Sequence, residues 1–274
     1  MVKIFNYIER KSFIHSLTGA SKLAFMFLFV FASMLTFYTP YLFILTIIAI
    51  IVLIMSNIKF YEIKAVIYFT LIFLFLNNFF IYIFAPKYGV EIFGTSHEIF
   101  RFNDRYNITL EQLLYHLNIV LKYTSTIPII VIFISSTKPN EFAASLNKIG
   151  VNYKIAYSVS IALRYIPDIS SEFNDIKNAM SARGVELSKK ERLFTRLKKT
   201  VQIIFPLILS SMDRIDVISN AMELRSFGKE KTRTWYSEVP FRVSDYVVVV
   251  LGLAVLFISI YLNYANGSRF YNPF

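Results

Sequence analysis

The sequence has no cysteine and few charged residues. Of its 274 residues none is Cys, and 17% are Asp, Glu, Lys or Arg, whereas about a quarter are charged in a typical soluble domain. The absence of Cys excludes disulfide bonds, a thiol nucleophile and a Cys-ligated metal. The scarcity of charge, together with 55% hydrophobic residues, excludes a disordered chain and favours a protein that has a lipid bilayer as its solvent.

The apolar residues are grouped in long runs. The first run, Leu23 to Met55, is 33 residues long and carries no charge. As one helix it would measure about 50 Å, which exceeds the ~30 Å hydrocarbon core of a bilayer. Pro40 lies in the middle of the run and suits a turn, so we expect two spans here, with one long tilted helix as the alternative. The five predicted spans are residues 22–38, 40–57, 66–85, 117–136 and 246–262.

The basic residues indicate an orientation in the membrane. Segment 137–243 holds 18 Lys and Arg against 11 Asp and Glu, while loop 86–116 is poor in basic residues. The positive-inside rule then predicts a cytoplasmic N-terminus, a cytoplasmic segment 137–243 and a C-terminus outside. The net charge of +11 is explained by topology, and because no nucleic-acid-binding motif accompanies it, nucleic acid is not an expected partner. The basic residues before the first span are Lys3, Arg10, Lys11 and Lys22.

Segment 137–243 has the pattern of one short and two long amphipathic helices. The short helix should end near Gly150. In each long pattern the apolar positions recur at alternating steps of four and three, which places them on one helix face. Pro167 and Pro206 lie inside these patterns and predict a kink in each helix. The two stripes are Ile155, Val159, Ala162, Ile166, Ile169, Phe173, Ile176 and Met180, then Leu197, Val201, Ile204, Ile208, Ser211, Ile215, Ile218 and Met222.

These patterns predict an all-α polytopic membrane protein. Residues 1–136 would form the membrane region with the first four spans. Residues 137–243 would form a cytoplasmic region with the short and the two long amphipathic helices, and residues 244–274 the last span with a short tail.

Both apolar stripes continue into an arginine, Arg183 in the first and Arg225 in the second. The sequence before each arginine is repeated at an offset of 42 residues: Ile176-x-Asn178-Ala179-Met180-x-x-Arg183 and Ile218-x-Asn220-Ala221-Met222-x-x-Arg225. Helix capping alone would explain a terminal Arg and Gly, but not the Asn-Ala-Met before the Arg. We therefore predict two equivalent helix tips that insert into grooves of a dimeric or pseudo-dimeric partner, because Ala permits close approach, Met adapts its shape and Arg supplies several donors.

Four motifs, in order along about 100 residues, resemble the transmembrane T component of energy-coupling factor (ECF) transporters, including its cobalt-transport permease (CbiQ-like) branch. The second arginine motif departs from the family's Ala-Arg-Gly, with Leu224 for Ala and Ser226 for Gly. The motifs are Thr137-Lys138-Pro139-Asn140-Glu141, Ala162-Leu163-Arg164-Tyr165-Ile166-Pro167, Ala179-Met180-Ser181-Ala182-Arg183-Gly184 and Ala221-Met222-Glu223-Leu224-Arg225-Ser226-Phe227.

The resemblance implies a non-catalytic scaffold in the plasma membrane of a prokaryote. Such a subunit links two cytoplasmic ATPase subunits to a membrane-embedded S component that binds a vitamin or a transition-metal ion. Arg164, Pro167 and Pro206 are structural or hinge candidates. The residues expected to dock on the ATPase subunits are Ala182, Arg183, Gly184, Ala221, Met222 and Arg225.

The sequence carries no nucleotide-binding or metal-binding motif of its own. It lacks the Gly-rich loop ending in Lys-Ser or Lys-Thr, so ATP should bind to partner chains, and its three His residues have no helical pairing that suits a metal. No cofactor is expected. Two alternatives stay open: a permease of an ordinary ABC importer, for which Glu141-Phe142-Ala143-Ala144 with Gly150 is a near match, and a membrane-embedded lipid-modifying enzyme, which would need acid–base or metal clusters at the span ends.

Overall fold

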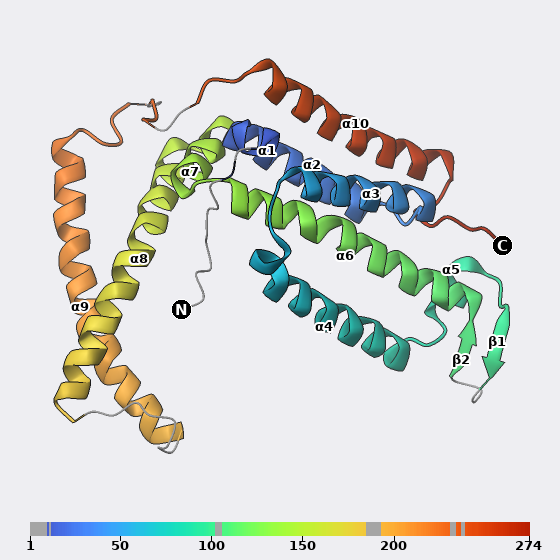
Figure 1. The fold of residues 1–274 in the computed structure, drawn as a ribbon, viewed down its shortest axis with the longest axis horizontal. Helices are drawn as coiled ribbons and strands as arrows, with labels where there is room; N and C mark the ends of the chain where they lie inside the picture. Colours follow the sequence, from blue (N-terminus) through green and yellow to red (C-terminus); the bar gives the residue numbers. More distant parts are fainter. Residues whose placement is uncertain (1–9, 11, 102–105, 185–192, 231–233, 237–238) are drawn as a thin grey trace. The chain divides into compact units, whose positions relative to one another are not determined.

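The computed structural model describes residue 10 and residues 12–101, 106–184, 193–230, 234–236 and 239–274. Over these residues the protein has ten helices and one small two-stranded sheet, and several helices are strongly apolar. The predicted all-α membrane fold is confirmed (Figure 1). Lys3 and Lys11, which contribute to the predicted orientation, lie outside the described residues.

The chain divides into two compact units, Met1–Lys138 with Val239–Phe274, and Pro139–Glu238. The first unit contains the apolar helices. Its short elements are α1 (Phe13–Ser16), α5 (Tyr88–Phe93), β1 (Glu98–Arg101) and β2 (Asn107–Thr109), and its long helices are α2 (Gly19–Leu35), α3 (Thr39–Met55), α4 (Phe60–Phe84), α6 (Leu110–Ser136) and α10 (Val243–Ala265). The strands pair antiparallel. The predicted cytoplasmic position of segment 137–243 stays a prediction.

Three helices of the described chain, α4, α6 and α10, are long and apolar enough to cross a membrane. Helices α2 and α3 are equally apolar but have 17 residues each, so the count of five spans stays a prediction. The charge-free run is two helices rather than one: α2 ends before Thr36, α3 begins at Thr39, and Pro40 occupies the first turn of α3, where its missing N–H costs no hydrogen bond.

The third and fourth apolar runs lie in helices that begin earlier than the predicted spans. Helix α4 begins at Phe60 rather than residue 66, and α6 begins at Leu110 rather than residue 117. Each extra segment mixes charged or polar residues with apolar ones, and a side chain caps each helix N-terminus. Glu62 accepts a hydrogen bond from Lys59 N at 3.0 Å, and Thr109 accepts one from Gln112 N at 3.2 Å. A prediction based on hydropathy identifies the apolar part of such a helix, but it does not identify the first turn, which depends on a capping hydrogen bond.

The core of the first unit lies where α2 packs against α6 and α10, and α3 packs against α6. Phe29, Leu42 and Leu45 are completely buried there. Helix α10 approaches α2 closely at Gly252, where a Cβ atom would lie 3.0 Å from Leu28 Cδ1. Helix α4 is by contrast mostly exposed. In a bilayer such apolar exposure carries no penalty, because lipid tails are as apolar as the side chains.

Buried polar side chains join these helices, as an apolar solvent requires. The fully buried Asp245 at the start of α10 accepts hydrogen bonds from Thr18 N at 2.8 Å and from Ser21 Oγ at 2.6 Å. Lys122 of α6 donates to Met34 O at 3.0 Å. These contacts attach the two ends of α2 to α10 and α6.

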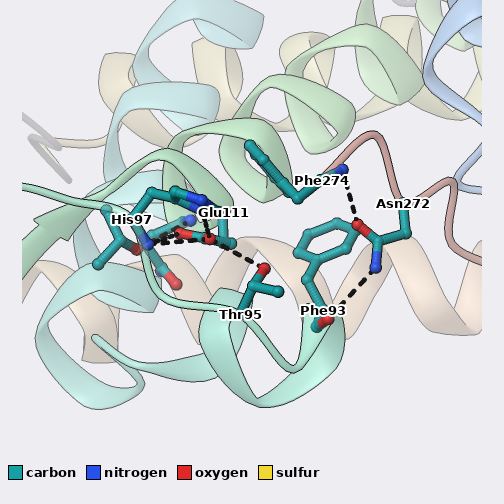
Figure 2. Close-up of polar contacts among 8 residues, drawn as sticks. Phe93, Thr95, His97, Glu111, Asn272 and Phe274 are labelled. Atoms are coloured by element: carbon teal, nitrogen blue, oxygen red, sulfur yellow. Dashed lines mark hydrogen bonds and ion pairs between the residues drawn. The ribbon is translucent and has the colours of Figure 1, made fainter.

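A second polar cluster holds the loop before α6 (Figure 2). The buried Glu111 carboxylate accepts hydrogen bonds from Thr95 Oγ1 and His97 N, each at 3.0 Å, and lies 2.7 Å from His97 Nδ1. The C-terminal segment joins this cluster: Asn272 Nδ2 donates to Phe93 O at 3.3 Å, and the Phe274 ring stacks on the His97 ring. The cluster therefore fixes the loop and the C-terminal segment at the first turn of α6.

Candidate docking site

The second unit consists, over its described residues, of α7 (Pro139–Lys148), α8 (Tyr153–Ala182) and α9 (Leu193–Leu224). The connection from α7 to α8 passes through Gly150, whose φ of +102° suits glycine. Asn152 then caps α8 by accepting a hydrogen bond from Lys154 N at 2.9 Å. One short and two long helices are thus present, as the sequence predicts.

Both prolines of the long helices lie inside continuous helix. Pro167 is in α8 and Pro206 is in α9, and each is exposed, as is the nearby Arg164. Figure 1 shows that α9 changes direction along its length. The assignment of these three residues to a hinge stays a prediction.

Helices α8 and α9 cross at a polar contact that the sequence reasoning did not single out (Figure 1). Arg214 Nη2 of α9 donates to Glu172 Oε2 of α8 at 2.8 Å. Ser210 donates to the other oxygen of the same carboxylate, and the Arg214 guanidinium lies 5.8 Å from the centre of the Tyr165 ring. All members are only partly buried, so the ion pair adds little stability. Its effect is to fix the register of the crossing.

The first arginine tip is the C-terminal end of α8. Ala182 is the last helical residue, and Arg183 is the C-cap, with its N–H donating to Ala179 O and Met180 O. Gly184 follows with φ +85° and donates to Ser181 O at 3.0 Å. This left-handed residue ends the helix. The side chain of Arg183 is exposed beyond the last turn.

The second tip has the same backbone termination despite its different sequence. Arg225 follows the last helical residue of α9, and Ser226 has φ +54°, the left-handed conformation that Gly184 has in the first tip. Ser226 N donates to Glu223 O and Phe227 N to Met222 O, each at 2.9 Å, which is the hydrogen-bond pair of a Schellman motif. Ser226 therefore adopts the left-handed conformation at the position where the family's motif has glycine.

The chain after the second tip is anchored on the start of α8. The Phe227 ring lies 5.7 Å from the Tyr153 ring and 4.9 Å from the Tyr157 ring. Trp235, the single Trp of the sequence, lies 6.2 Å from Tyr157 and donates from Nε1 to Asn147 Oδ1 of α7 at 3.0 Å. These aromatic contacts hold the second tip against the helices that precede the crossing.

The apolar stripes of α8 and α9 line a groove between the two helices. Stripe residues from both helices form it, together with the crossing residues Tyr165 and Arg214. The stripe members in the groove are Ala162, Ile169, Ser211, Ile215, Ile218 and Met222. Much of the stripe surface is nevertheless uncovered: Ile166 is 52% exposed, Ile208 51% and Ile215 58%. Exposed apolar patches of this kind mark interaction surfaces.

The candidate residues separate into two environments. Ala182, Arg183, Ala221 and Arg225 are exposed at the tips, whereas Met222 is half-buried and lines the groove. The crossing residues Glu172 and Arg214 could have been found from the sequence, because they are 42 positions apart, the offset of the repeated motif. Within the described part of the chain, no group of three or more His, Asp or Glu is placed to hold a metal ion.

Comparison with known proteins gives a family and named relatives. A model of the family described as cobalt transport protein, CbiQ, matches residues 10–236. The energy-coupling factor transporter transmembrane protein of Staphylococcus aureus is 27% identical over 95% of this chain and 96% of its own length. The protein of the same name from Limosilactobacillus fermentum is 38% identical, over 40% of this chain and 41% of its own length. That of Thermotoga maritima is 25% identical over 78% of this chain and 83% of its own.

The family match covers residues 10–236, which include all four motifs, both arginine tips and parts of both structural units; α10 lies beyond it. Together with the apolar helices α4, α6 and α10, it shows that this chain is a membrane protein of the CbiQ cobalt transport protein family.

Proposed function

We propose that the protein is the membrane scaffold and coupling subunit of an ATP-driven ECF importer. It would link two cytoplasmic ATPase subunits to a substrate-binding S component, for uptake of a vitamin or a transition-metal ion. Membership of the CbiQ family and relatives named as energy-coupling factor transporter transmembrane proteins support this proposal. The observation that carries it is the pair of arginine tips with the same backbone termination.

Each tip would insert into a groove on one ATPase subunit. A guanidinium at the C-terminal end of a helix carries several N–H donors in a planar fork, a geometry that suits carboxylate or carbonyl oxygens of a partner. The small residues Ala182 and Ala221 beside the arginines allow the helix backbone to approach closely. ATP would be bound and hydrolysed by the partner subunits, and this chain would supply no catalytic group and no cofactor.

The crossing would transmit the motion of the ATPase pair. When the two subunits close on ATP, their grooves move relative to each other, and each groove carries one helix end. Because Glu172, Ser210 and Arg214 fix the crossing point, a displaced tip turns its helix about that point. The uncovered stripe surface around Ile166 and Ile208 would contact the S component, which then reorients and releases its substrate inward.

The docking proposal is tested by charge reversal at both tips. Arg183→Glu with Arg225→Glu should abolish co-purification of the ATPase subunits from membranes, because each groove would meet a charge of the opposite sign. The matched control is Lys177→Glu with Lys198→Glu, which makes the same change of charge at exposed positions on the same two helices and should leave the complex intact. Retention of the ATPase subunits by the tip variant would show that the arginines do not dock.

Co-purification of a Glu141 variant, compared with the double arginine variant, separates this function from that of an ordinary ABC permease. A permease that meets its ATPase through one loop would lose the complex when Glu141 is changed and keep it when the two arginines are changed. The scaffold proposal expects the reverse.

A further inference from the structure

The first half of α9, residues 193–208, has an exposed apolar face. Four large apolar side chains recur there at steps of three and four, which places them on one side of the helix. Ile203, which the helical period places on the opposite side, is completely buried. The helix therefore buries its other side and leaves this face uncovered. The four exposed fractions are Phe194 83%, Leu197 65%, Val201 62% and Phe205 63%.

This face is separate from the surfaces of the second unit that have been assigned above. The α9 residues that line the groove between α8 and α9 begin at Ser211, and the crossing contact uses Ser210 and Arg214. The first half of α9 precedes all of them, and it lies at the end of the helix opposite to the arginine tip. Neither the crossing nor the tip therefore accounts for an apolar face at this end.

The two halves of α9 differ in the sign of their charge. Residues 193–208 contain three basic residues and no acidic one, whereas residues 209–224 contain one basic and three acidic residues. Lys198 is exposed, and it lies seven positions before Phe205, on the same side of the helix. Apolar side chains are exposed in both halves, and Val217 in the second half is 68% exposed. The combination of an exposed apolar face with a basic surrounding thus distinguishes the first half.

We propose that the first half of α9 binds the surface of a bilayer that contains anionic lipid. The four apolar side chains enter the boundary between headgroups and acyl chains, and the basic residues attract the lipid phosphate groups. A bilayer surface supplies both an apolar medium and a negative charge, which are the two properties that this half of the helix calls for. The apolar helices of the first unit already hold the chain in a membrane, so even a weak contact is formed.

The test places a fluorescent label on each half of α9 in the full-length protein. The sequence has no Cys, so a single introduced Cys is labelled uniquely. Val201→Cys and Val217→Cys are matched, because they change the same residue type on the same helix at similar exposure. The labelled proteins are reconstituted in nanodiscs of phosphatidylcholine, with or without phosphatidylglycerol, and without ATPase subunits or S component. Brominated acyl chains in these lipids quench a label that contacts them.

We expect strong quenching of the Val201→Cys label in nanodiscs with phosphatidylglycerol, and little quenching of the Val217→Cys label in any of them. Quenching at Val201→Cys should fall at least about twofold without phosphatidylglycerol, or in about 1 M salt, where charges are screened beyond about 3 Å. Thermal unfolding checks that each variant folds, and Leu197→Cys replaces Val201→Cys if it does not.

Three results would overturn the proposal of lipid binding. The first is equal quenching of the labels at the two positions. The second is quenching at Val201→Cys that does not depend on phosphatidylglycerol. The third is shielding of that label only after an S component is added, which would assign the face to a protein. Because the nanodiscs hold neither ATPase subunits nor S component in the main measurement, its failure leaves the docking proposal untouched.

Discussion

Arg214 and Glu172 form a 2.8 Å ion pair across the crossing of α8 and α9, and they are 42 positions apart. The same offset separates Arg225 from Arg183 in the repeated motif. Each arginine tip therefore lies eleven residues beyond its own member of the ion pair, from 172 to 183 and from 214 to 225. At a rise of 1.5 Å per residue each helix extends about 16 Å from the crossing to its tip. Equal lengths on both sides suit a partner made of two similar subunits.

The crossing pair predicts a charge-swap rescue. Arg214→Glu should destabilise the protein by about 1 kcal/mol, because it sets two carboxylates against each other at a partly exposed contact. Adding Glu172→Arg should restore most of that loss, which a double-mutant cycle on thermal unfolding in detergent would measure. If the stability change of the double variant equals the sum of the two single changes, the two side chains do not interact.

Ser226 and Gly184 both have a positive φ, so a change to glycine and a change to alanine should have opposite effects on the stability of the helix ends. Ser226→Gly should stabilise the end of α9 by about 0.5–1 kcal/mol, because glycine adopts a positive φ without strain, and Gly184→Ala should cost about 1 kcal/mol at the end of α8. Hydrogen exchange of the last helical turn measures each effect. Ser226 is not among the residues expected to dock and Ser226→Gly keeps Arg225, so co-purification of ATPase subunits should persist in that variant. Faster exchange in Ser226→Gly would contradict the shared termination.

The contact between Trp235 and Tyr157 predicts a fluorescence response at the second tip. Tyr157→Ala should move the Trp235 emission to longer wavelength, because the indole ring would lose aromatic cover and gain contact with water. The signal is unambiguous since the chain has a single Trp. Tyr236→Ala is the control, because that side chain is fully exposed, and it should leave the spectrum unchanged.

The buried carboxylate of Asp245 predicts a large loss of stability in the first unit. Asp245→Ala should lower the free energy of unfolding by about 3 kcal/mol, because it leaves the buried Thr18 N–H without its acceptor, removes the 2.6 Å hydrogen bond from Ser21 Oγ and removes a cap from α10. Asp213→Ala, at an exposed position of α9, should change it by less than about 0.5 kcal/mol. Thermal unfolding of both variants in the same detergent makes the comparison, and similar melting temperatures would refute the assigned role of Asp245.

The sequence by itself determined the long helices, the apolar faces of α8 and α9 and the arginine that follows each of them, but not the short helices α1 and α5. These features repeat at the helical period or at a fixed offset, so that they can be recognised without knowing any tertiary contact. The apolar runs showed a membrane protein for the same reason, because hydropathy sums over neighbours in sequence. The predicted spans leave out the first turns of α4 and α6, because charged residues interrupt the apolar runs there and a cap depends on a hydrogen bond rather than on hydropathy.

Only the tertiary structure decided which side chains join the helices. The contacts of Glu172 with Arg214, Asp245 with Thr18, and Phe227 with Tyr153 bring together residues from 42 to 227 positions apart. A polar residue has many candidate partners at such separations, and the packing of the helices selects one. The left-handed conformation of Ser226 was decided in the same way: serine does not require it, and the hydrogen bonds that end α9 impose it.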